Sequence, residues 1–71
     1  MHTIANTCLS ILFSPVNLAW VLCWCGSHVL GVCDTQAEAW DRAADLCEGE
    51  QREYCLRRAR AVRDGYKRFM H

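Results

Sequence analysis

The side chains best suited to chemistry gather in one stretch, WVLCWCGSHVLGVC, which runs from Trp20 to Cys33. Thiolate and imidazole groups are ligands that tetrahedral zinc prefers. In a β-hairpin that turns at Gly26-Ser27, alternate side chains point to the same face. Cys23, Cys25 and His28 would then converge near the turn, and these residues are therefore the candidates for a zinc site.

The spacing of these three ligands, C-x-C-x2-H, differs from that of common zinc ribbons and fingers, and Cys47 or Cys55 would have to supply the fourth ligand. Free cysteine is also among the residue types most often buried. Cys47 and Cys55 flank a predicted turn and could be bridged if oxidised, and six cysteines would suit a disulfide scaffold. We predict that the thiols serve as packing, without a cofactor, and keep zinc and disulfides as alternatives.

The sequence gives little indication of catalysis. It contains no glycine-rich phosphate loop and no G-x-S-x-G nucleophile motif. A pair formed by Cys25 and His28 would lack a third residue to orient it, and a chain of 71 residues rarely encloses a substrate pocket. We predict that the protein is not an enzyme and has no small-molecule substrate.

Charge is distributed unevenly along the chain, although eight basic residues balance eight acidic ones. Residues 1–33 carry no Asp, Glu, Lys or Arg, residues 34–50 are mainly acidic, and residues 52–71 are mainly basic. The zero net charge argues against a DNA mimic and against a generally basic nucleic-acid binder. The length predicts one small domain, residues 1–71, whose own core is marginal, so that a cross-link, a metal or a partner would add stability.

The uncharged first third of the chain raises the question of a membrane segment. Residues 4–25 are mostly apolar, and about 20 such residues are enough to span a bilayer. Pro15 and several polar side chains interrupt this run, and no Lys or Arg precedes it as in a secretory signal. We predict a cytoplasmic protein for which a membrane is not the partner, and keep membrane insertion and export as alternatives.

The spacing of apolar residues predicts strands first and helices afterwards. Residues 17–25 and 28–33 form the hairpin, whereas residues 8–13 form either a strand or a short helix. Thr35 with Glu38 predicts a capping box at the start of a first helix.

The first helix is expected to end at Gly49, and a second runs from about residue 50 to residue 69. The apolar stripe of the second helix consists of Cys55, Ala59, Val62, Tyr66 and Phe69. We therefore predict a small α+β domain in which an antiparallel sheet of two or three strands, with its hairpin at Gly26-Ser27, packs against two C-terminal helices.

Two surfaces could carry a binding function. Both faces of the hairpin are apolar, and we expect the helices to leave free the face with Trp20 and Trp24. That face would lie under residues 1–14, against a second copy or against a foreign partner. The basic side chains of the last helix are either a solvated helix face or a site for a negatively charged partner. The candidate binding residues are Trp20, Trp24, Arg57, Arg60, Arg63, Lys67 and Arg68.

These features predict a small non-catalytic protein-binding module, whose partner is another protein or a protein–nucleic acid complex, and which could also form a homodimer. Its format is that of accessory proteins of phages and mobile elements that inhibit host complexes, anti-CRISPR proteins among them; this is an analogy of format only. The alternatives are a nucleic-acid-binding accessory protein that uses its basic helix and a small zinc-binding protein.

Overall fold

The sheet of the computed structural model is an antiparallel meander with strand order β1-β2-β3-β4. Its strands are followed by two helices. The elements are β1 His2–Thr3, β2 Leu9–Ser14, β3 Ala19–Trp24, β4 His28–Cys33, α1 Gln36–Asp45 and α2 Gly49–Phe69. The structure describes residues 2–5 and 7–69, and the side chains among them up to residue 65.

The predicted α+β class with two C-terminal helices is confirmed, but the sheet has four strands instead of two or three. Residues 8–13, which the sequence left open, belong mostly to β2. The additional strand is β1, in which His2 pairs with Ile11 and Thr3 with Ser10. A strand of two residues is too short to show an alternating pattern, so β1 could not be predicted from the sequence.

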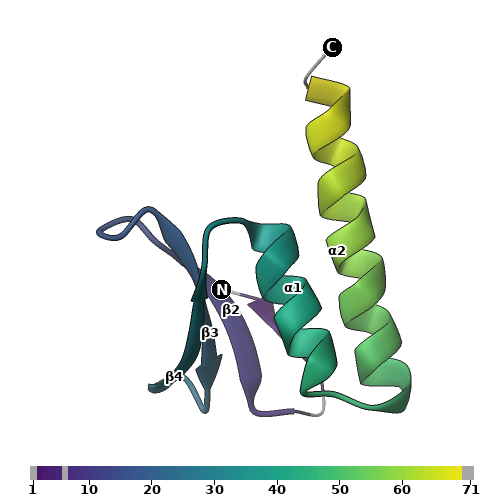
Figure 1. Ribbon diagram of the computed structural model, residues 1–71. Coiled ribbons are helices and arrows are strands. Elements are labelled where there is room, and N and C mark those ends of the chain that lie inside the picture. Colours follow the sequence, from purple (N-terminus) through teal and green to yellow (C-terminus); the bar gives the residue numbers. More distant parts are fainter. Residues whose placement is uncertain (1, 6, 70–71) are drawn as a thin grey trace.

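The elements form three layers, and α1 is the middle one (Figure 1). α1 contacts β2, β3 and β4 on one side and α2 on the other. Alanines on several sides of α1 let both neighbours approach closely, and these buried alanines are Ala37, Ala39, Ala43 and Ala44. The face of the sheet that points away from α1 is covered by neither helix (Figure 1).

The core lies between the sheet and α1 and continues between the two helices. Trp40 of α1 is fully buried at its centre, together with Leu22 and Ile11 from the sheet. In α2 the predicted apolar stripe is confirmed for Cys55 and Ala59, which are buried, and partly buried Val62 packs against the core. Tyr66 and Phe69 of that stripe lie outside the described side chains.

The hairpin between β3 and β4 turns one residue earlier than predicted. The two residues with positive φ are Cys25 and Gly26, at 53° and 76°, and the N–H of Ser27 donates to the carbonyl oxygen of Trp24 over 3.3 Å. Positive φ at both central residues is typical of a type I′ turn, whereas a type II′ turn at Gly26-Ser27 was expected. Both turns match the twist of the strands that they join, and Gly26 fits either.

A hairpin that turns at Gly26-Ser27 would pair Trp20 with Cys33 and Cys23 with Leu30. Trp20 does pair with Cys33, but Cys23 pairs with Val29. A β-bulge between these pairs leaves Leu30 as an extra residue in β4.

The capping box at the start of α1 is present on its threonine side, since the N–H of Glu38 donates to Thr35 Oγ1 over 3.2 Å. The helix ends at Asp45, with Leu46 as its C-cap, earlier than the predicted stop at Gly49. Among the residues described, no helix combines the length and the hydrophobicity that crossing a membrane requires.

Removal of this cap gives a first testable prediction. Thr35→Ala leaves one backbone amide of the first turn of α1 without its partner, and we expect it to lower the free energy of unfolding by about 1 kcal/mol. Thr35→Ser keeps an acceptor oxygen at the same place and serves as the control. Urea denaturation followed by circular dichroism measures both variants. Equal midpoints for Ala and Ser would contradict a role of the cap.

Candidate protein-binding surface

The face of the sheet that points away from α1, called the open face here, is built from every second side chain of the strands. Leu22, Ile11 and Cys33 face the core with α1, so their neighbours in each strand point the other way. Cross-strand pairing then places the members of the open face in two rows. The row near the turn is Thr3, Ser10, Cys23 and Val29, and the next row is Leu12, Val21 and Val32.

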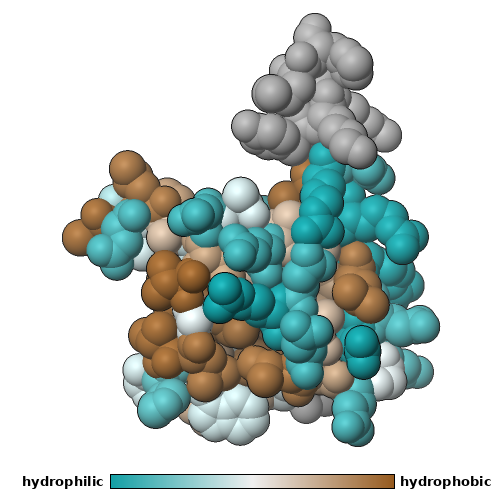
Figure 2. All heavy atoms as spheres, viewed as in Figure 1, coloured by the Kyte–Doolittle hydropathy of each residue, from teal (hydrophilic) through white to brown (hydrophobic). Residues whose placement is uncertain are grey.

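The open face is mainly apolar, with Thr3 and Ser10 as its polar members, and its apolar side chains on the outermost strand β4 are exposed. The three β4 side chains Val29, Leu30 and Val32 have 57%, 44% and 53% of their surface exposed. Val21 and Cys23 of the inner strand β3 are buried. Figure 2 shows hydrophobic side chains gathered on the sheet side of the molecule, whereas hydrophilic ones dominate the helical side. Contiguous exposed apolar surface generally marks an interaction site.

The β-bulge enlarges this surface. In a regular strand Val29 and Leu30 would point to opposite faces. Because Leu30 is the extra residue, Val29 pairs with Cys23 and lies on the same face as Leu30 and Val32. The one sequence signal for the bulge is the neighbouring Gly31, since glycine inside a strand often marks one.

The open face carries no charged side chain, because none of residues 1–33 is Asp, Glu, Lys or Arg. All charges therefore belong to the helices, to the segments beside them and to the C-terminal end. A surface without charges offers no ion pair to phosphate groups, and it can be buried against another apolar surface without desolvating a charge.

The two tryptophans predicted as binding residues lie on the other face of the sheet. α1 covers the face with Trp20 and Leu22, so the expectation that the helices would leave it free is wrong. The ring of Trp20 is partly buried against the core, with the ring of Phe13 5.4 Å away in an edge-on arrangement. Trp24, at the end of β3, remains 46% exposed. A binding role for either residue stays a prediction.

Two of the described arginines of α2 make contacts within the molecule. Arg63 donates to the carboxylate of Asp41 in α1, and this hydrogen bond raises the pKa of Arg63. Arg58 is placed over Trp40, with its guanidinium carbon 5.5 Å from the ring centroid. Arg57 and Arg60 are exposed. The side chains of Lys67 and Arg68 lie outside the described part, so binding by this group of residues stays a prediction.

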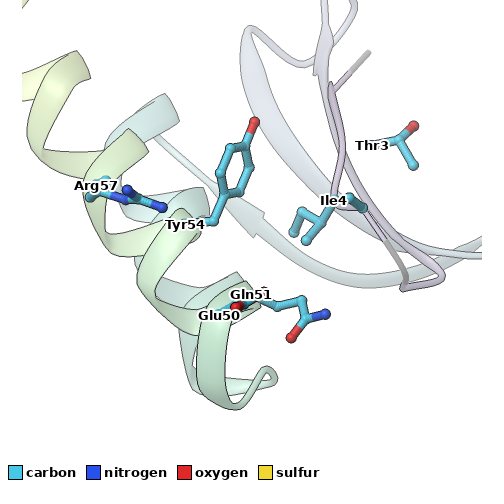
Figure 3. Close-up of a pocket in the computed structure, with 7 residues that line it drawn as sticks. Thr3, Ile4, Glu50, Gln51, Tyr54 and Arg57 are labelled. Carbon is cyan, nitrogen blue, oxygen red and sulfur yellow. The ribbon is translucent and has the colours of Figure 1, made fainter.

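A shallow hollow of about 300 Å³ lies between α2 and the segment that follows β1 (Figure 3). Tyr54 of α2 and Ile4 of the segment after β1 lie on opposite sides of this hollow (Figure 3). The opposite charges of Glu50 and Arg57 both line it and offset each other, so the hollow does not concentrate positive charge. Thr3, Ala5 and Gln51 complete the lining.

The candidate zinc ligands do not converge as the sequence suggested. Cys23 is buried on the open face, whereas His28 pairs with Trp24 and therefore lies on the opposite side of the sheet. Cys25 is exposed in the turn. Within residues 2–5 and 7–69, no three His, Cys, Asp or Glu side chains lie close enough together to hold a metal ion. The shifted turn and the bulge cause this difference, because they change which residues share a face.

Comparison with known proteins finds no matching protein family, no matching curated protein and no matching solved structure. The surface and the side chains of the chain itself are therefore the basis for a proposal about its function.

Proposed function

We propose that this chain is a small non-catalytic protein-binding module that docks through the open face of its sheet. The observation that supports the proposal is the cluster of half-exposed apolar side chains Val29, Leu30 and Val32 on a face without charges. When such a face packs against another apolar surface, it loses contact with water. This burial is favourable by roughly 25 cal/mol for each Å².

A protein fits this face better than a nucleic acid does. Nucleic-acid binding depends on Lys and Arg contacts to phosphates, and the open face provides neither. On the helical side, Arg63 forms an ion pair with Asp41, and the guanidinium group of Arg58 lies over the ring of Trp40. Nucleic-acid binding by the remaining basic residues stays a prediction. A binding assay at two salt concentrations would test it.

The partner that we propose is a second copy of the chain. Two identical uncharged faces bury each other without opposing like charges, and a domain of 71 residues gains stability from such an addition to its core. The contact expected is face to face, as in two packed sheets about 10 Å apart. Pairing along the edge of β4 is less suitable, because the bulge at Leu30 interrupts the regular ladder there.

The strength of such a dimer follows from the side chains that it buries. Each half-exposed Val or Leu contributes about 1 kcal/mol when fully buried, and two copies provide six of them. The cost of association consumes much of this gain, so we expect a weak dimer that forms only at high protein concentration.

Light scattering after size-exclusion chromatography tests the proposal, with the fully reduced chain loaded at a series of concentrations up to about 1 mM. The expected result is a weight-average mass that rises from the 8.1 kDa of one chain toward twice that value. A mass of 8.1 kDa at every concentration would exclude the second copy as the partner. The small size of the chain and its lack of a catalytic motif also suggested that it inhibits a host complex. Binding to such a second partner stays a prediction.

A further inference from the structure

Two exposed thiols lie side by side at the end of the β2–β3 pair. Cys8 precedes β2 and Cys25 follows β3, and since Leu9 pairs with Trp24, these cysteines are the next opposite pair. The N–H of Cys25 donates to the carbonyl oxygen of Cys8 over 2.7 Å, so the backbone pairing continues to this position. Opposite Cα atoms in an antiparallel pair are about 4.5 to 5.5 Å apart, and a disulfide accepts about 4.4 to 6.8 Å.

The side chain of Cys8 also acts on that of Cys25, since a hydrogen bond with Cys8 raises the pKa of the Cys25 thiol. The backbone of Cys25 has a φ of 53°, in the left-handed region that residues with a side chain rarely adopt. The turn thus holds Cys25 opposite Cys8, and both residues are open to reagents in solution.

A second pair of cysteines provides a contrast inside the same molecule. Cys47, between the helices, acts on Cys55 of α2 in the same way, but both are buried. Burial, with the nearby Cys47 as a smaller cause, raises the pKa of Cys55 to about 12. The thiolate is the form of cysteine that reacts, so this pair remains inert packing near neutral pH.

We propose that Cys8 and Cys25 form a dithiol modification site, which takes small disulfides of the glutathione type as its reaction partner. One protein thiolate attacks a sulfur of the small disulfide, forms a mixed disulfide and releases one small thiolate. The second protein thiolate then attacks the protein sulfur of that mixed disulfide and releases the other. The protein loses two electrons and two protons in forming the Cys8–Cys25 bond, and the small disulfide is reduced to two thiols.

The bond would connect the two ends of the β2–β3 hairpin. It closes a loop of moderate length, which restricts the unfolded chain more than the folded one. We expect the melting temperature of the oxidised protein to exceed that of the reduced protein by roughly 10 °C. The inference does not depend on the open face, because Cys8 and Cys25 lie beyond the last pair of β2 and β3.

The test uses the full reduced chain under native conditions with oxidised glutathione at pH 8, followed by alkylation and mass spectrometry. Trypsin leaves four of the cysteines on one fragment, because the first basic residue after them is Arg42. Chymotrypsin separates Cys8 from Cys25 by cutting after Phe13 and Trp24. We expect loss of two hydrogens and a linked pair of peptides that contain Cys8 and Cys25, with Cys47 and Cys55 alkylated only after denaturation.

Variants distinguish a dithiol from two independent thiols. Cys25→Ser should stop the reaction at the mixed disulfide, with glutathione retained on Cys8, whereas Cys47→Ser should leave formation of the bond unchanged. A stable glutathione adduct on both cysteines of the wild type would overturn the proposal. A bond from Cys8 or Cys25 to another cysteine, or no reaction under conditions in which iodoacetamide modifies both, would overturn it as well.

Discussion

Leu30→Lys is expected to keep the protein monomeric at concentrations at which the wild type dimerises. Leu30 is 44% exposed and lies between Val29 and Val32 on the open face. In a face-to-face dimer each copy would bring one ammonium group into an apolar contact, and neither would find a counter-charge on a face without acidic residues. We expect the dissociation constant to rise at least about a hundredfold, which corresponds to about 3 kcal/mol.

Leu56→Lys is the matched control for this experiment. Leu56 lies on α2 and is 42% exposed, so the substitution changes residue type, charge and exposed area in nearly the same way at a place away from the open face. Light scattering should give a dimer for Leu56→Lys and a monomer for Leu30→Lys, and circular dichroism should give a folded spectrum for both. Equal masses for the two variants would contradict docking through the open face.

Trp40→Ala is expected to remove a large part of the stability of the chain, about 3 to 5 kcal/mol. Trp40 is fully buried in α1, where the ring of Tyr54 packs edge-on at 5.9 Å and the ring of His2 lies 5.8 Å away. Truncation of a buried tryptophan costs about 3 to 5 kcal/mol. A domain of 71 residues has a total free energy of unfolding of only about 4 to 10 kcal/mol.

Trp24→Ala applies the same substitution at the edge of the core and is the control for Trp40→Ala. Because Trp24 is about half exposed, less apolar surface returns to water, and we expect a loss of no more than about 1.5 kcal/mol. Urea denaturation followed by tryptophan fluorescence and circular dichroism compares the two. A midpoint for Trp40→Ala equal to that for Trp24→Ala would show that Trp40 does not hold the sheet and the two helices together.

Much of the fold could be predicted from the sequence, because its main signals are local. The Thr35 cap and the apolar spacing of Cys55 and Ala59 predict helices from neighbours along the chain. Strand β1 could not be predicted, since two residues carry no pattern and their pairing with β2 is a contact between separate segments. The position of the turn could not be predicted either, because Gly26 suits both a type I′ and a type II′ turn.

The candidate surface could be predicted only in its general character. The absence of charge in residues 1–33 correctly indicated a sheet with two apolar faces, of which the helices cover only one. Which face the helices cover depends on how α1 packs, and an apolar pattern on both faces does not decide this. The place of Val29 depends on the bulge, for which Gly31 is the only local sign.

A mixed sample of methyl-labelled and unlabelled chains tests most directly whether the open face is the docking surface. At high protein concentration, isotope-filtered nuclear Overhauser spectra detect contacts only between different copies. The expected contacts come from the methyl groups of Leu12, Val29, Leu30 and Val32. Contacts from Leu46 and Leu56 of the helical side instead, or no contacts between copies at about 1 mM, would contradict the account.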